Sequence, residues 1–245
     1  MTLTLPARQQ FSTSNALALG FAQWTAERLG GAVAARGAAL LVVSGGTTPT
    51  AYFHALSAQP IDWSRVSITL ADERRVPEDS PRSNAKLVRE ALMRDKAASA
   101  QFVPLANSKL DGDREIAAAN ARIAALPAPA DIVVLGMGED GHTASWFPGA
   151  EGLADAIDLG ARALVAPISA PGIPEPRLTL TGRVILRARA LALHIEGPKK
   201  LATLEKALGE GPLETMPIRA VLRQAGDLAV MIEQHCARAR GSLVE

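Results

Sequence analysis

Hydrophobic and polar positions along the chain fall into two alternating patterns. Short continuous apolar runs, such as AALLVV at 38–43, are typical of strands that are buried on both faces of a sheet. Longer segments between them carry apolar residues at helical spacing. The apolar runs predict strands at 38–43, 66–70, 131–135, 164–168, 191–195 and 228–232. The periodic segments predict helices at 14–35, 49–58, 83–95, 113–125 and 198–208.

This alternation of strand and helix predicts an α/β protein, with a mostly parallel sheet and helices on both of its faces. The chain has 245 residues, which is enough for one sizeable core, and it contains no internal repeat or low-complexity tract. The Pro- and Gly-rich segment PISAPGIPEP at 167–176 is a candidate linker. We interpret it as a loop within a single domain that spans residues 1–245.

Three polar turns directly follow predicted strands, at residues 44–48, 72–75 and 138–142. In an open parallel sheet, ligands bind in the crevice beyond the carboxyl ends of the strands. We therefore expect these turns, although they are distant in the chain, to converge at one rim of the sheet and to form a site.

The segment DIVVLGMGEDGHTASWFPG at 131–149 contains G-x-G-x-x-G, the glycine spacing of dinucleotide-binding folds. That fingerprint normally opens the first βαβ unit, and an acidic residue ends the next strand. Here it lies past the middle of the chain, and the next predicted strand ends near Ile168 without an acid. We therefore do not expect NAD. A tight turn explains the glycines, but it leaves His142 as a candidate for proton transfer and Asp140 as a carboxylate that fixes its tautomer.

The turn at 44–48 links a strand to a helix. Thr48 suits the N-cap, Pro49 suits the first helical position, and free amides at a helix start attract anions such as phosphate. The turn lacks the Gly-Lys-Ser/Thr ending of a Walker A loop. A plain capped helix start remains an alternative interpretation.

Basic side chains near strand ends are candidates for binding an anion. Arg74, in the charged turn at 72–75, would grip phosphate in a bidentate fork, and Arg177 is a second such group. Lys199 and Lys200 follow the strand predicted at 191–195. A solvated charged turn and ordinary surface lysines are the alternatives.

Composition and charge narrow the classes of function. The net charge is +1 and only 4% of the residues are aromatic, so nucleic-acid binding is not expected. The single cysteine, Cys236, allows no internal disulfide and fits a reducing compartment. No apolar run approaches the ~18 residues that cross a bilayer, and residues 1–11 do not resemble a signal peptide. We expect a soluble, cytoplasmic protein without a membrane partner.

The four histidines, His54, His142, His194 and His235, show none of the spacings of a zinc site, so no metal is expected. His194 alternates with apolar neighbours, as a structural residue in a strand would. His235 and Cys236 are adjacent and would face apart on a helix, which does not support a Cys–His nucleophile.

Four segments together resemble one known family. They are VVSGGTTPTAYFHAL (42–56), ADERRVPEDSPRSNAKLVREAL (71–92), DIVVLGMGEDGHTASWFPG (131–149) and RLTLTGRVILRARALALHIEGPKK (177–200). In order and across nearly the whole chain they are similar to the 6-phosphogluconolactonases, which share a Rossmann-like, doubly wound α/β sheet with the glucosamine-6-phosphate deaminases. The resemblance implies hydrolysis of 6-phospho-D-glucono-1,5-lactone to 6-phospho-D-gluconate, in the oxidative branch of the pentose phosphate pathway and without a cofactor.

The resemblance also implies roles for individual residues. His142 would be the general base that activates water, and Asp140 would orient it. Arg74, Arg177 and Lys200 would hold the phosphate, and Lys200 is preferred to Lys199 because it matches the family's Gly-x-x-Lys. The other expected substrate contacts are Ser44, Gly45, Gly46, Thr47, Asp72 and Gly141. Among these, the backbone at 44–47 would donate to the carbonyl oxygen, and Asp72 would hold a sugar hydroxyl or Arg74.

Two alternatives to the lactonase stay open at this point. The deaminase branch has a glutamate where this chain has Phe147, and usually a tyrosine where it has Arg74. Both differences favour the lactonase. A non-catalytic sugar-phosphate sensor is the second alternative, although Asp140 and His142 are both present. We expect the partner to be a small sugar-phosphate lactone, and the protein to be a monomer or a weak homodimer.

Overall fold

The computed structural model describes residues 7–107, 110, 112–224 and 226–233. Its larger sheet has seven strands in the order β1-β10-β9-β6-β2-β3-β5, and each neighbouring pair is parallel. These strands are β1 (Ala7–Phe11), β2 (Ala39–Val43), β3 (Val66–Leu70), β5 (Gln101–Phe102), β6 (Ile132–Leu135), β9 (Ala190–Ile195) and β10 (Leu228–Glu233). The predicted fold class, an α/β protein with a mostly parallel sheet, is confirmed.

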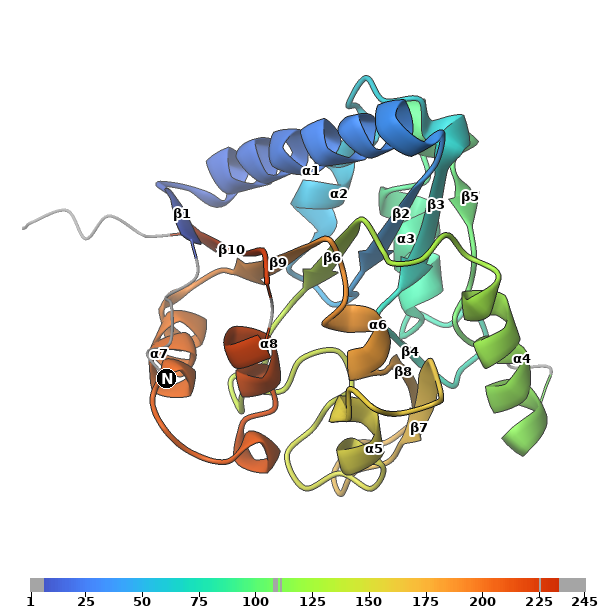
Figure 1. Ribbon diagram of the computed structural model, residues 1–245. Coiled ribbons are helices and arrows are strands. Elements are labelled where there is room, and N and C mark those ends of the chain that lie inside the picture. Colours follow the sequence, from blue (N-terminus) through green and yellow to red (C-terminus); the bar gives the residue numbers. More distant parts are fainter. Residues whose placement is uncertain (1–6, 108–109, 111, 225, 234–245) are drawn as a thin grey trace, which may run out of the picture.

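Helices flank this sheet on both sides. They are α1 (Ser14–Arg36), α2 (Thr50–Ser57), α3 (Asn84–Ala91), α4 (Gly112–Ala124), α5 (Leu153–Ile157), α6 (Gly182–Ile185), α7 (Pro198–Leu208) and α8 (Ile218–Gln224), with short 3₁₀ turns at Trp63–Arg65, Asp95–Ser99 and Leu213–Thr215. Figure 1 shows α1 running across one face of the large sheet, while α5, α6 and α8 lie on the opposite side.

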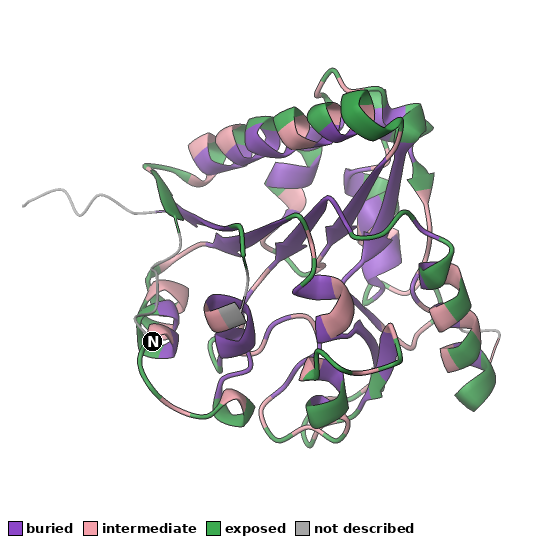
Figure 2. Ribbon diagram, viewed as in Figure 1, coloured by how far each residue is buried: buried purple, intermediate pink, exposed green. Residues whose placement is uncertain are grey.

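Burial explains why the apolar runs form the central strands. Every residue of β2, β3, β6 and β9 is buried, so that these strands form the middle of the core in Figure 2. A parallel sheet covered by helices on both faces requires such uninterrupted apolar strands. By contrast, β1 at the sheet edge is exposed along almost its whole length, and its polar sequence ARQQF did not predict a strand.

Side-chain caps set the starts of two helices close to where the sequence predicts them. The Thr13 hydroxyl accepts a hydrogen bond from the Ala16 amide at the start of α1, and Ser83 does the same for Lys86 in α3. In α2 the prediction is wrong by one residue. Pro49 occupies the N-cap, and the Thr48 side chain does not cap the helix.

A second, three-stranded sheet corrects two further predictions. It consists of β4 (Asp72–Arg74), β8 (Arg177–Leu180) and β7 (Val165–Ile168), paired antiparallel. The predicted turn at 72–75 is therefore largely a short strand, held by pairing with β8. The strand predicted at 164–168 does form, but in this small sheet and not in the parallel one.

The order of the strands creates a crevice between β2 and β6. The chain builds the sheet from β2 outward through β3 to β5, and then returns to the other side of β2 with β6. This reversal is the topological switch point, where connections leave in opposite directions and a crevice opens at the carboxyl ends of the strands. The Ser44 amide, just after β2, donates to the carbonyl oxygen of Val134 in β6 at 3.0 Å.

Several expectations fall outside the described residues. His235 and Cys236 lie there, as do residues 1–6 and the last residues of the proposed 1–245 domain. Among the described helices, none combines the length and apolar character that would be needed to cross a membrane.

Candidate active site

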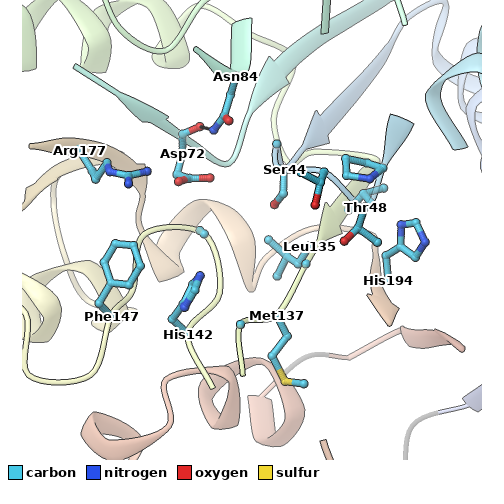
Figure 3. Close-up of a pocket in the computed structure, with 18 of the residues that line it drawn as sticks. Ser44, Thr48, Asp72, Asn84, Leu135, Met137, His142, Phe147, Arg177 and His194 are labelled. Atoms are coloured by element: carbon cyan, nitrogen blue, oxygen red, sulfur yellow. Dashed lines mark hydrogen bonds between the residues drawn. The ribbon is translucent and has the colours of Figure 1, made fainter. Parts of the chain in front are cut away.

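The three polar turns meet around one pocket at the switch point (Figure 3). Its volume is about 380 Å³, within the ~300–1,000 Å³ that is usual for small-molecule sites. Nine of the residues expected at a site line it: Ser44, Gly45, Gly46, Thr47, Asp72, Arg74, His142, Arg177 and Lys200. The remaining two, Asp140 and Gly141, lie in the turn that supports His142.

An imidazole–carboxylate pair stands at one side of the pocket. The Nδ1 atom of His142 lies 2.6 Å from Oδ1 of Asp140, and the same oxygen accepts the His142 backbone N–H at 3.0 Å. Burial raises the pKa of Asp140, but these hydrogen bonds and the attraction to His142 outweigh it and hold the pKa below its ordinary value. Asp140 is therefore ionised near neutral pH, and Nε2 of His142 remains available to the pocket.

The glycines at 138 and 141 build the turn that carries this pair. A Cβ at Gly138 would lie 2.2 Å from two atoms of the His142 ring, so that only glycine leaves room for the imidazole. Gly141 has φ +84°, a left-handed conformation that glycine adopts without strain. The G-x-G-x-x-G spacing thus serves the packing of a histidine against its own turn.

Phe147 packs against both His142 and Arg177. Its ring centroid lies 4.6 Å from that of His142, and the Arg177 guanidinium carbon lies 5.8 Å from the ring. The side chain is buried and lines the pocket between the two groups (Figure 3). An apolar ring here restricts the rotation of the imidazole and keeps water from one side of it.

Side chains along β4 point alternately toward the pocket and toward α3. Asp72 and Arg74 face the pocket, whereas Glu73 points the other way and accepts hydrogen bonds from the amides of Asn84 and Ala85 at the start of α3. Burial raises the pKa of Glu73, although these hydrogen bonds oppose the shift. Glu73 therefore anchors α3 behind the site.

Two residues that the sequence analysis missed hold Asp72 in place. The buried Ser145 hydroxyl donates to Oδ2 of Asp72 at 2.6 Å, and Nδ2 of Asn84 donates to the Asp72 carbonyl oxygen at 2.9 Å. Asn84 also fills the space that a side chain at Gly45 would need. Ser145 lies two residues before Phe147 in the HTASWFPG segment and Asn84 begins α3, but neither a serine in a loop nor an asparagine at a helix start carries a chemical pattern of its own.

Arg74 and Arg177 occupy paired positions on β4 and β8. Burial lowers the pKa of Arg177, and the positive charge of Arg74 lowers it further. The buried Nε of Arg74 has no hydrogen-bond partner among the described residues, while its Nη1 donates to the Arg82 carbonyl oxygen. Two guanidinium groups that repel one another at a pocket wall favour an anionic ligand.

The loop at 44–48 lies on the other side of the pocket. Lys200, near the start of α7, donates from Nζ to Oγ1 of Thr48 at 3.1 Å. Within the described part of the chain, the amides of residues 45–48 donate to no backbone or side-chain acceptor. Lys199, by contrast, is exposed and pairs with Glu139 at 3.8 Å. The structure therefore separates the two lysines, and only Lys200 reaches the pocket.

His194 is a further pocket residue whose place was not expected. It is buried in β9, as predicted for a structural histidine, but it also lines the pocket and binds Glu196. His54 is exposed on α2. Across the described ranges, no three His, Cys, Asp or Glu side chains gather in a way that would hold a metal ion.

Fold and site together define an α/β protein with a switch-point pocket that is lined by cationic side chains and by an imidazole paired with a carboxylate. Residues 12–230 match the family model described as Glucosamine-6-phosphate isomerases/6-phosphogluconolactonase. The chain belongs to this family, and the resemblance of its four segments is confirmed.

Similar proteins point to one branch of the family. The chain is 48% identical over 215 residues to a 6-phosphogluconolactonase of Rhizobium meliloti (strain 1021), covering 88% of this chain and 93% of the relative. It is 45% identical over 224 residues to one from Pseudomonas aeruginosa, covering 90% and 94%. The crystal structure of a 6-phosphogluconolactonase from Shewanella baltica OS155 superposes with a TM-score of 0.91 at 41% identity, over 95% of this chain and 99% of that one.

The other branch shares the fold. A monomeric glucosamine-6-phosphate deaminase has a TM-score of 0.76 and 20% identity, over 94% of this chain and 98% of its own. At that identity the likeness shows the architecture alone.

Proposed function

We propose that this protein hydrolyses 6-phospho-D-glucono-1,5-lactone to 6-phospho-D-gluconate. The observation that carries the proposal is the His142–Asp140 pair, at 2.6 Å, on the wall of a pocket that three cationic side chains also line. The names of the relatives at 45–49% identity support the same substrate. The reaction belongs to the oxidative branch of the pentose phosphate pathway.

His142 is the proposed general base. Its Nδ1 is engaged by Asp140, so Nε2 is the atom that takes a proton from water as the water oxygen attacks C1 of the lactone. The tetrahedral intermediate then collapses with cleavage of the bond between C1 and the ring oxygen. The imidazolium returns its proton to that oxygen, and the product leaves as a ring-opened acid. Because a lactone is a reactive ester, no covalent intermediate with the protein is needed.

Asp140 supports this step without touching the substrate. Its lowered pKa keeps a negative charge beside the ring, which favours the imidazolium that forms during water attack. Phe147 holds the opposite side of the imidazole. The pair is thereby oriented before the substrate arrives, and this orientation is the basis of catalysis by proximity.

We assign the phosphate to the loop at 44–48 and the cations around it. Lys200 is already bound to Thr48, and the amides of 45–48 are free, which is the arrangement that suits a phosphate oxygen. Arg74 and Arg177 approach from β4 and β8, and a dianion would relieve the repulsion between them. From the sequence, the loop amides were expected to donate to the carbonyl oxygen of the lactone, but the position of Lys200 favours the phosphate as their ligand.

Asp72 is proposed to bind a sugar hydroxyl. Its carboxylate is buried and oriented by Ser145, and it lies between the imidazole side of the pocket and the 44–48 loop (Figure 3). A lactonase needs no proton transfer at C2, so a fixed hydrogen-bond acceptor is a sufficient role for this side chain.

Several finer points remain proposals that rest on the sequence. These are a cytoplasmic location, an enzyme that needs no cofactor, a monomer or weak homodimer, and a single catalytic domain. A coupled assay at several protein concentrations measures the specific activity, and a specific activity that depends on protein concentration would indicate association of the chains.

The deaminase and the sensor are distinguished from the lactonase by one assay. The protein is given freshly prepared 6-phosphogluconolactone and, separately, glucosamine 6-phosphate. We expect catalysed formation of 6-phosphogluconate above the spontaneous rate and no release of ammonia. Ammonia release would support the deaminase instead, and binding of phosphogluconate without turnover would support the sensor.

A further inference from the structure

A second imidazole–carboxylate pair lies on the far side of the pocket from His142. The Nε2 atom of His194 is 2.7 Å from Oε1 of Glu196, and the two side chains are only 4% and 22% exposed. His194 lines the pocket, and Figure 3 places it beside Thr48, on the side away from Arg177. The proposed hydrolysis makes no use of this pair.

Aromatic rings hold the His194 imidazole in a fixed plane. Phe21 meets it edge-on at 5.5 Å and Tyr52 at 6.1 Å, with interplanar angles of 78° and 75°. These two rings stack on one another at 4.1 Å, and the Tyr52 hydroxyl is hydrogen-bonded to Thr25 at 3.0 Å. Edge-to-face contacts of this kind fix the orientation of a ring. His194 can therefore direct Nε2 at Glu196 and at little else.

Glu196, the partner of this imidazole, also interacts electrostatically with Lys200. It lies between the end of β9 and the start of α7, four residues before Lys200. Burial raises the pKa of Glu196, but hydrogen bonds from His194 and Ser14 and the electrostatic attraction of His194 and Lys200 lower it by more. An ionised carboxylate therefore attracts the Lys200 ammonium, whose Nζ donates to Oγ1 of Thr48 at 3.1 Å.

We propose that His194 and Glu196 form a positioning pair for Lys200 at the phosphate end of the pocket. His194 holds the carboxylate so that it attracts the ammonium without drawing it away from Thr48. Without the imidazole, Glu196 would keep only its hydrogen bond with Ser14, so that its carboxylate could turn and pair with Lys200, and the ammonium would be lost to the phosphate. This inference rests on the proposed function, since it needs a phosphorylated substrate bound at the 44–48 loop.

The test compares two substitutions that separate the hydrogen bond from the aromatic packing. His194→Phe keeps a ring between Phe21 and Tyr52 but removes the nitrogen. His194→Gln gives up the ring but keeps an amide donor near the position of Nε2. The matched control is His54→Phe, at an exposed histidine on α2. Lys200→Met and the double variant His194→Phe/Lys200→Met complete a double-mutant cycle, which measures the coupling between the two residues.

The readouts are KM and kcat for 6-phosphogluconolactone and for unphosphorylated gluconolactone. We expect His194→Phe to raise KM for the phosphorylated lactone by about 5- to 10-fold, with kcat within about 2-fold of wild type. Hydrolysis of the unphosphorylated lactone should not change. His194→Gln should recover most of the affinity. In the Lys200→Met background, His194→Phe should add less than about 2-fold.

A purely structural histidine predicts the reverse pattern. His194→Phe would then match wild type, His194→Gln would unfold or lose activity on both substrates, and the double variant would be additive. If the wild-type protein hydrolyses the lactone, any one of these three outcomes overturns the inference and leaves the proposed function intact. A wild type that fails to hydrolyse the lactone overturns the proposed function itself.

A spectroscopic measurement that needs no substitution at His194 guards against His194 variants that do not fold. In ¹⁵N-histidine-labelled protein, inorganic phosphate should shift the ring resonances of His194, and this shift should vanish in Lys200→Met. The resonances of exposed His54 serve as the internal control. A His194 signal that does not respond to phosphate, in an active enzyme, would contradict the coupling.

Discussion

The imidazole of His142 occupies the space that a side chain at residue 138 would need. A Cβ built on Gly138 would lie 2.2 Å from both Cε1 and Nδ1 of the ring, and 2.6 Å from Oδ1 of Asp140. The Gly138 amide in turn donates to the His142 carbonyl oxygen at 2.9 Å. The turn therefore packs closely against the proposed catalytic pair, and a single methyl group at residue 138 is enough to displace this pair.

Replacing this glycine should reduce turnover without unfolding the protein. Gly138→Ala forces His142 and Asp140 to move, and a shift of about 1 Å in a catalytic group costs on the order of 10²-fold in rate. Gly31→Ala is the control, because Gly31 is exposed on α1, away from the pocket, and a Cβ there meets no atom within 4 Å. The measurement is kcat of both variants, with circular dichroism to confirm folding. Equal activity in the two variants would contradict this view of the turn.

Acid should weaken the contribution of Asp140 to folding. Because its pKa is lowered in the folded protein, the carboxylate stabilises the fold above the ordinary carboxyl pKa of about 3.9. This contribution disappears as pH falls through the lowered folded-state value. Asp140→Asn should therefore be less stable than wild type at neutral pH, and the two should converge in acid.

Denaturant unfolding at a series of pH values measures this difference. Asp79→Asn is the control, since Asp79 is exposed and its side chain makes no hydrogen bond or ion pair to any described residue. A gap between wild type and Asp140→Asn that stays constant from neutral to acid pH would refute the assignment.

Loss of the Ser145 hydroxyl should lower the stability of the folded protein. Ser145→Ala leaves the buried Asp72 carboxylate with one hydrogen bond fewer, at a cost of about 1–3 kcal/mol in the free energy of unfolding. Ser169→Ala removes a similar hydrogen bond to Glu151, but at an exposed position, and should cost less than about 0.5 kcal/mol. Urea unfolding of both variants gives the comparison, and equal losses would count against a positioning role for Ser145.

The phosphate assignment predicts a loss of substrate discrimination. Arg177→Ala and Lys200→Ala should each raise KM for 6-phosphogluconolactone while leaving unphosphorylated gluconolactone almost unaffected. Lys199→Ala is the control, because Lys199 is exposed and its Nζ lies near Glu139. If both variants keep the wild-type preference for the phosphorylated lactone, the phosphate lies elsewhere.

The fold was predictable where burial determines the pattern. The strands near 38–43, 66–70 and 191–195 are buried along their whole length, and their continuous apolar runs therefore predicted buried strands. The edge strand β1 was missed because its exposed residues need no apolar pattern. The small sheet was missed because β4 is a charged segment that becomes a strand only by pairing with β8, which is more than a hundred residues away.

The candidate site was predictable where chemistry and turn position coincide. Asp140, His142 and the 44–47 loop were expected because reactive or glycine-rich residues follow strands that end at one rim, whereas Lys200 was selected only through the family's Gly-x-x-Lys pattern. Ser145 and Asn84 act by holding Asp72, and nothing in a single sequence distinguishes a buried serine or asparagine with a partner from any other. His194 was expected to be structural because its neighbours are apolar. Its proximity to Thr48 follows from strand order, which the sequence does not reveal.

The most direct test of the account is the turnover of His142→Ala with freshly prepared 6-phosphogluconolactone, after subtraction of the spontaneous hydrolysis rate. General acid–base catalysis by His142 predicts a fall in kcat of about 10²–10⁴-fold in a folded protein. A kcat close to that of wild type would contradict the assignment of this imidazole as the base, and with it the proposed mechanism.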